Sequence, residues 1–192
     1  ENPESAAVYL VSPSYFGAVA DIAAIAEVAH RHDVALIVDE AWGSHLGFHP
    51  EIPGNAIRAG ADLVVSSSHT GAGSLTQSAM LLRGSGPHAR ALGEAIHRAL
   101  PLVQTTSPSG LLLGSLDAAR RHLAVHGEEL LGRTLADVTA LRAALAEDDR
   151  FRSADAAALQ HADVVALDPL TVVLDLRFAG IGGHEAMTGL MA

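Results

Sequence analysis

The sequence predicts an α/β fold in which helices cover a parallel or mixed sheet. Short apolar runs of three to five residues, nearly free of charge, alternate with longer stretches of helical periodicity. Because strands buried on both faces are continuously apolar, these runs are expected to form a covered sheet. With 192 residues, 49% of them hydrophobic and 18% charged, the chain is long enough for one domain with a substantial core.

Six segments are predicted to be strands. The first four are the apolar runs themselves, each followed by polar or small residues at the point where a strand would end. The last two are separated by Asp168 and Pro169, which favour a turn. The predicted strands are residues 7–11, 35–38, 63–65, 80–82, 164–167 and 171–176.

Helices are predicted between and after these strands. The apolar residues of 21–32 recur on one helical face, and Asp21 places a negative charge at the end where the helix dipole favours it. The longest helix is expected to break near His126 and Gly127 or at Gly132, because glycine weakens a helix interior. The other predictions are a helical turn at 56–59, helices at 87–99, 109–146 and from His184 onward, and an Ala-rich linker within 142–162.

Composition excludes several classes of function. Acidic residues outnumber basic ones 22 to 12, and this net charge of −10 argues against a nucleic-acid partner. No apolar run approaches the roughly 20 residues of a membrane helix, and no export leader is visible. The absence of cysteine excludes disulfides and thiolate chemistry and fits a cytoplasmic protein. All 12 basic residues are arginine, so no lysine side chain can serve as an amine nucleophile.

Four polar clusters mark candidate sites. In an open α/β sheet, ligands bind beyond the carboxyl ends of the strands, where the first three of these clusters lie. The third cluster is rich in hydroxyls and small residues and suits a phosphate, although a helix-capping loop has a similar composition. Asp39 ends an apolar strand, where it is expected either to pair with a cation, such as a protonated pyridine nitrogen, or to act as a cap. The clusters are residues 12–17, 39–45, 66–71 and 105–109.

Two other kinds of site find weaker support. His45, His49 and His69 could converge on a metal, but His49 precedes Pro50 in a loop, so no metal site is expected. A hydrolase triad can be written from Ser67, His69 and Asp39. No Gly-x-Ser-x-Gly motif surrounds the serine, so this alternative ranks lowest.

Taken together, the clusters resemble the major domain of the Orn/Lys/Arg decarboxylases, pyridoxal 5'-phosphate (PLP) enzymes of fold type I. This resemblance implies part of the three-layer α/β/α large domain of the aspartate aminotransferase type. Residues 1–150 are expected to be a partial PLP-binding domain and 151–192 the truncated start of a following α+β segment, so that the sequence is a fragment. The matching segments are residues 8–17, 36–50, 59–69, 75–80, 104–109, 115–121 and 168–171.

The resemblance also implies roles around the cofactor ring. Asp39 would keep the pyridine nitrogen protonated, which makes the ring an electron sink. Ala41 would lie against one face of the ring. Trp42 stands where many members of the family have histidine. A small-molecule amino acid is the implied substrate, which would be decarboxylated to its amine and CO₂ in polyamine metabolism.

Further residues are implied on the phosphate and substrate sides. Ser67, Ser68 and His69 would lie around the cofactor phosphate or the covalent link to the protein. Ser14 belongs to the loop on the substrate side. Residues 105–109 resemble a segment that reaches a neighbouring subunit, which implies a homodimer or a higher homo-oligomer.

Position 70 departs from the family pattern. The family has Ser-x-His-Lys, in which the lysine forms the Schiff base, whereas His69 is followed here by Thr70. Three explanations remain open: a true replacement, a lysine lost from the written sequence, and a deliberate substitution. The implied function is decarboxylation of ornithine, lysine or arginine in the intact parent enzyme. The alternatives are a non-catalytic homologue or partner subunit, and a different PLP reaction on the same fold.

Overall fold

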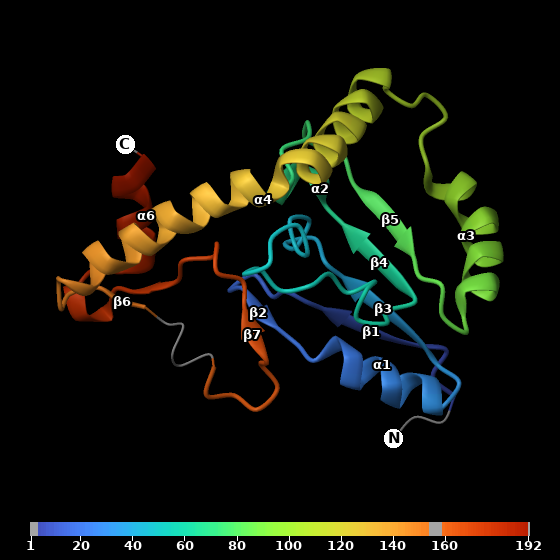
Figure 1. The fold of residues 1–192 in the computed structure, drawn as a ribbon, viewed down its shortest axis with the longest axis horizontal. Helices are drawn as coiled ribbons and strands as arrows, with labels where there is room; N and C mark the ends of the chain where they lie inside the picture. Colours follow the sequence, from blue (N-terminus) through green and yellow to red (C-terminus); the bar gives the residue numbers. More distant parts are fainter. Residues whose placement is uncertain (1–3, 154–158, 192) are drawn as a thin grey trace.

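A four-stranded mixed sheet forms the centre of the fold in the computed structural model, which describes residues 4–153 and 159–191 (Figure 1). Its strand order is β1-β3-β4-β5; β1, β3 and β4 are parallel, and β5 is antiparallel to β4. All four strands were predicted from sequence to within one residue. They span β1 (Ala7–Val11), β3 (Ala35–Asp39), β4 (Leu63–Ser66) and β5 (Met80–Arg83).

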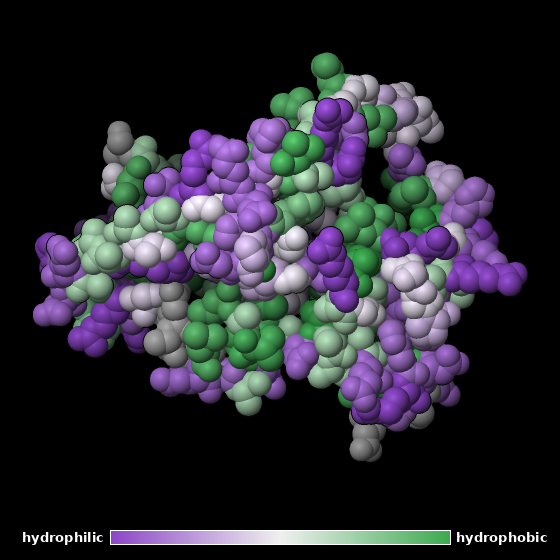
Figure 2. Space-filling view, in the orientation of Figure 1, coloured by the Kyte–Doolittle hydropathy of each residue, from purple (hydrophilic) through white to green (hydrophobic). Residues whose placement is uncertain are grey.

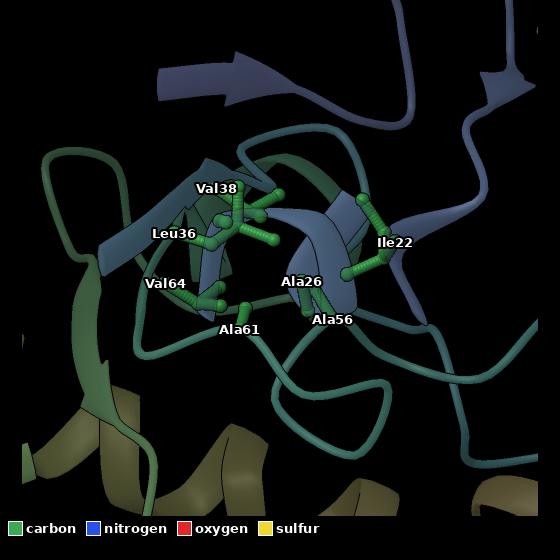
Figure 3. Close-up of a cluster of buried hydrophobic side chains, with 8 residues drawn as sticks. Ile22, Ala26, Leu36, Val38, Ala56, Ala61 and Val64 are labelled. Carbon is green, nitrogen blue, oxygen red and sulfur yellow. The ribbon is translucent and has the colours of Figure 1, made fainter. Parts of the chain in front are cut away.

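Helix α1 (Ile22–Arg31) connects β1 to β3 and covers one face of the sheet. The Asp21 side chain caps it by accepting a hydrogen bond from the Ala24 N–H, at 2.9 Å. Small alanines on the buried side of the helix let it approach the strands closely, and Figure 3 shows these side chains meeting. The buried cluster consists of Ile22, Ala26, Ala29, Leu36, Val38, Ala56, Ala61 and Val64.

The opposite face of the sheet is not covered by the residues that the structure describes. Side chains alternate along each strand, so Tyr9, Val11 and Leu81 point away from α1, and they are 62%, 47% and 43% exposed. The sequence predicted strands buried on both faces. Among the described residues, the buried cluster lies on the α1 face, and the predicted burial of the second face is not seen at these side chains.

Two helices follow the sheet. Helix α3 (Ala89–Val103) lies beside β5, where Arg83 donates a hydrogen bond to the Ala89 carbonyl at 3.0 Å. Helix α4 (Gly110–Ala146) continues without interruption, so the predicted break near Gly127 or Gly132 is wrong. A Cβ added to Gly127 would lie 3.1 Å from the Cβ of Phe48, and one added to Gly132 would lie 3.2 Å from His49. These glycines therefore serve close packing between α4 and the loop after β3.

The corner between α3 and α4 leaves apolar side chains at the surface. Leu102, Val103 and Leu111 are 84%, 82% and 79% exposed. In Figure 2, hydrophobic surface lies between α3 and the start of α4, where Figure 1 places β4 and β5. Among the described helices, none combines the length and the hydrophobicity that crossing a bilayer requires.

The last part of the chain consists of short elements. Of the predicted strands 164–167 and 171–176, only two residues each form a strand, β7 and β8. Strand β7 pairs with β2 and β8 pairs with β6, two equally short strands that the sequence did not predict. The expected helix from His184 is present and begins one residue earlier. Residues 154–158 of the predicted linker lie outside the described part, while 142–146 belong to α4. Apart from β2 (Ala18–Val19), which precedes α1, these elements are β6 (Arg152–Ser153), β7 (Ala166–Leu167), β8 (Leu174–Asp175), η1 (Arg177–Ala179) and α6 (Gly183–Met191).

Candidate active site

Asp39 lies at the carboxyl end of β3, on the uncovered face of the sheet. Its register neighbours are Val11 of β1 and Val65 of β4, so it lies at the middle of the parallel strand ends. The Tyr9 hydroxyl donates to one carboxylate oxygen at 2.7 Å, and the Ala41 N–H donates to the other at 3.0 Å. These two bonds fix the direction of the carboxylate and leave it half-exposed.

The hydrogen bond to Asp39 also affects Tyr9. The pKa of the Tyr9 hydroxyl is raised above its ordinary value, mainly by this hydrogen bond. Burial and the charge of the carboxylate raise the pKa further. A phenol with a raised pKa keeps its proton and therefore remains a donor. Tyr9 is a residue that the sequence did not single out, because its role depends on the β1–β3 register.

Thr70 lies next to Ala41, within a short helix that the sequence did not predict. Helix α2 (Ser68–Gly71) begins directly after Ser67 at the end of β4. The Thr70 hydroxyl lies 2.7 Å from the Ala41 carbonyl and 2.7 Å from the Ser67 carbonyl. Its single proton can be donated to one of them at a time. The structure thus brings Asp39, Ala41, Ser67 and Thr70 together at adjacent strand ends.

Ser68 and His69 occupy the first turn of α2 but face different surroundings. Ser68 is buried, and its hydroxyl has no hydrogen-bond partner among the described residues. Nδ1 of His69 lies 2.9 Å from the Ser78 carbonyl, so this ring nitrogen is directed towards the chain before β5. A buried hydroxyl without a partner costs free energy, and an anionic ligand is one group that could satisfy it.

Two other predicted residues are engaged locally. The Ser14 hydroxyl accepts a hydrogen bond from the Ala18 N–H at 3.2 Å and thereby closes its own turn. Trp42 packs edge-on against Tyr15 with ring centroids 4.9 Å apart, and it is 44% exposed. The loops after β1 and β3 therefore meet, but the Ser14 hydroxyl is not directed into the Asp39 cluster.

The structure does not assemble the alternative histidine sites. His45 contacts Asp168 at 3.1 Å, and Nδ1 of His49 accepts the Glu51 N–H at 3.1 Å. His69 contacts the Ser78 carbonyl, as described above, rather than a serine hydroxyl. Each histidine thus has a different partner, and the Ser67–His69–Asp39 triad is not formed.

The contact between His45 and Asp168 is a buried pair that the sequence did not reveal. Their side chains are only 7% and 4% exposed. Burial alone would raise the pKa of Asp168. The contact with His45 and the hydrogen bonds from Leu170 and Thr171 together outweigh burial, so the pKa of Asp168 lies below its ordinary value. The pair joins the loop after β3 to the segment after β7. A separation of 123 residues leaves no local sequence signal for it.

Comparisons with known proteins agree on the family. A family model described as "Orn/Lys/Arg decarboxylase, major domain" matches residues 1–173. Arginine decarboxylase of Bacillus subtilis is 36% identical over 185 residues, which cover 96% of this chain and 37% of that protein. Arginine decarboxylase of Halalkalibacterium halodurans is 35% identical, with the same coverage of both proteins. The chain thus spans little more than a third of these relatives.

Solved structures show the same fold at low sequence identity. Cystathionine gamma-lyase from Lactobacillus plantarum matches 88% of this chain and 43% of its own, with a TM-score of 0.63 and 20% identity. Constitutive lysine decarboxylase from E. coli matches 77% of this chain and 22% of its own, with a TM-score of 0.59 and 20% identity.

These likenesses confirm the predicted fold class, the large domain of the aspartate aminotransferase type. The match to the family model extends over nine-tenths of the chain, from the first strand to the segment after β7. The chain therefore belongs to the Orn/Lys/Arg decarboxylase family, within the part that forms the family's major domain.

Proposed function

We propose that this sequence serves the PLP-dependent decarboxylation of a basic amino acid, as the major-domain portion of a longer enzyme. Family membership and the arginine decarboxylases of Bacillus subtilis and Halalkalibacterium halodurans support this class of reaction. The single observation that carries the proposal is the placement of Asp39. Its carboxylate is fixed by two hydrogen bonds and is accessible at the strand ends where α/β sheets bind ligands.

The residues around Asp39 fit PLP held without a covalent bond. The carboxylate can accept a hydrogen bond from a protonated ring nitrogen, and Tyr9 keeps it oriented for that contact. Ala41 carries only a methyl group at this position, and its N–H holds the Asp39 carboxylate at 3.0 Å. When bound, PLP supplies an electron sink for the electron pair released when CO₂ departs.

Thr70 does not fit a covalent link. A threonine hydroxyl cannot form a Schiff base, and the chain contains no lysine that could replace it. The Thr70 hydroxyl lies within hydrogen-bond distance of the Ala41 and Ser67 carbonyls, so threonine has local partners at this position. This observation favours a second candidate function, a non-catalytic homologue or partner subunit that retains the cofactor pocket.

A covalent trapping experiment tests the assignment of position 70. We expect Thr70→Lys, incubated with PLP and then borohydride, to gain a stable mass increase of one cofactor. The wild-type chain, without any lysine, should gain none at this site. Thr134→Lys on the surface of α4 is the matched control, because its amine is equally new but lies away from Asp39. Equal labelling of both lysine variants would contradict the proposed pocket.

Pyridoxyl amino acids test the substrate class without requiring lysine. These reduced conjugates carry the cofactor and the amino acid in one stable molecule. We expect pyridoxyl-arginine, -ornithine or -lysine to bind the wild-type chain more tightly than pyridoxyl-glutamate in equilibrium titrations. Equal affinity for all four conjugates would argue against a site for basic amino acids and leave the second candidate function.

A further inference from the structure

We propose that His30, Asp62 and His88 form a binding site for a divalent transition-metal cation such as Zn²⁺. The three side chains come from the last turn of α1, the residue before β4 and the residue before α3. Figure 1 shows these three places gathered at one end of the sheet. Asp39 lies at the carboxyl end of β3, whereas Asp62 precedes the amino end of the parallel strand β4. This site is therefore separate from the proposed cofactor pocket.

Asp62 is the centre of the cluster. It is fully buried, and its Oδ2 accepts hydrogen bonds from the Leu36 N–H at 2.9 Å and from Nε2 of His30 at 2.8 Å. Its second oxygen, Oδ1, is buried and has no partner among the described residues. A buried carboxylate with one unsatisfied oxygen is costly, so a cation beside Oδ1 would stabilise it.

His88 presents a second unsatisfied ligand atom. Its Nε2 is buried and also lacks a partner within the described part of the chain. The ring centroids of His88 and His30 lie 5.6 Å apart, and one ligand atom from each of the three residues lies within 4.8 Å of the others. Asp62 and His88 thus each bring one orphaned atom to a cluster that also contains the His30 ring. On coordination through Nε2, His30 would lose the proton that it now shares with Asp62.

The space beside Asp62 is kept open by a glycine. A Cβ placed on Gly86 would lie 3.0 Å from Oδ1 of Asp62, so any larger residue would crowd this oxygen. The side chain of His30 is 24% exposed, which gives a path from solvent to the cluster. The site is therefore small, charged, and reachable from outside.

The donor set selects the class of metal. Two imidazoles and one carboxylate are typical Zn²⁺ ligands, with bonds of about 2.0–2.2 Å, and water can supply the fourth position. Such bonds hold tetrahedral ligand atoms roughly 3.3 Å apart, so ligand atoms that now lie within 4.8 Å of one another would move closer on binding. Mg²⁺ and Ca²⁺ prefer oxygen ligands and are disfavoured by the two histidines.

The metal would attach α3 to the rest of the domain. Within the described residues, α3 buries no side chain of its own. Coordination by His88 would fix the N-terminus of α3. His30 would link the metal to α1, and Asp62 would link it to the sheet. Bound Zn²⁺ should therefore protect α3 against proteolysis.

Zn²⁺ binding by His88 variants tests the proposal. The exposed pair His122 and His126 on α4, with ring centroids 5.3 Å apart, could bind metal independently, so both are first changed to alanine. In this background, equilibrium dialysis should give one Zn²⁺ per chain. We expect His88→Ala to weaken this binding at least tenfold and His97→Ala, elsewhere on α3, to leave it unchanged. Equal affinity of the two variants would overturn the site.

Two measurements keep the test independent of how well the variant folds. Co²⁺ added to the background chain should produce the intense visible absorbance of a tetrahedral site; the weak spectrum of aqueous Co²⁺ alone would contradict the proposal. Trypsin can cleave α3 only at Arg90 and Arg98, because the chain has no lysine. We expect Zn²⁺ to slow both cleavages in the background chain but not in His88→Ala; equal rates with and without Zn²⁺ would contradict the anchoring role.

Discussion

Asp39 and Glu40 are neighbours in the sequence, but their carboxylates lie in different surroundings. Asp39 is half-exposed and accepts the Tyr9 hydroxyl, whereas Glu40 is 3% exposed and accepts the Ala56 N–H at 2.7 Å. Burial raises the pKa of Glu40 to about 7, and the hydrogen bond from Ala56 only partly opposes this. The two residues therefore differ in place: Asp39 lies at the strand ends where we propose the ligand, and Glu40 lies within the fold.

The raised pKa of Glu40 predicts a specific pH dependence of stability. The folded chain binds this proton more tightly than the unfolded chain, whose glutamate has a pKa of 4.5. The contribution of the protonated Glu40 to the free energy of unfolding, about 3 kcal/mol, is therefore fully present below about pH 4.5. It is lost as the pH rises towards 7. Urea unfolding of the wild type and of Glu40→Gln at pH 5 and pH 8 measures this. The variant should lose less stability between these two pH values, and an identical loss would refute the assignment.

At the scale of elements, the glycines of α4 show how packing overrides local preference. Gly127 faces Phe48 at a distance that leaves little space for a methyl group, whereas a Cβ on Gly114 would meet nothing within 4 Å. Both glycines lie inside the same helix, where replacing glycine by alanine ordinarily stabilises by roughly 0.5–1 kcal/mol.

Alanine at these two glycines should therefore have different effects. We expect Gly114→Ala to raise the free energy of unfolding by roughly 0.5–1 kcal/mol, from reduced backbone entropy alone. Gly127→Ala should raise the free energy of unfolding by less than this, or lower it, because the added methyl group must displace Phe48. Chemical unfolding of the two variants measures the difference, and equal stabilisation would mean that α4 does not pack closely on Phe48.

Sequence patterns predicted the elements whose causes are local. Strands β1, β3, β4 and β5 and helix α1 follow from apolar runs and from the cap at Asp21. The patterns missed the two-residue strands, because their pairing joins distant segments, and they predicted a false break in α4. Position 70 and Asp39 were predicted to share a site, whereas the roles of Tyr9 and Asp168 depend on tertiary neighbours that spacing cannot indicate.

At the scale of the whole molecule, several large apolar side chains of the described residues are exposed. The corner of α3 and α4 presents Leu102, Val103 and Leu111 next to residues 105–109, the segment predicted to reach a neighbouring subunit. Apolar patches of this kind typically mark interaction sites. We propose that this corner contributes to a homo-oligomer.

Charge introduced at this corner tests the oligomer. We expect the wild-type chain to self-associate in a concentration-dependent manner, and Leu102→Asp combined with Val103→Asp to shift it to monomer. Leu190→Asp on α6, at a residue that is 88% exposed, provides the matched control and should leave association unchanged. Light scattering coupled to size-exclusion chromatography gives the mass. A monomeric wild-type chain, or equal masses for both variants, would contradict the proposed interface.

The central claim, that Asp39 receives the ring nitrogen of PLP, is tested most directly by the affinity of PLP for the wild type and for Asp39→Asn. Because the carboxylate bond to a protonated nitrogen contributes about 1.5–3 kcal/mol, we expect the dissociation constant to rise roughly 10- to 100-fold in the variant. Asp21→Asn, which changes only the α1 cap, should bind PLP as the wild type does. An unchanged dissociation constant for Asp39→Asn would contradict the claim.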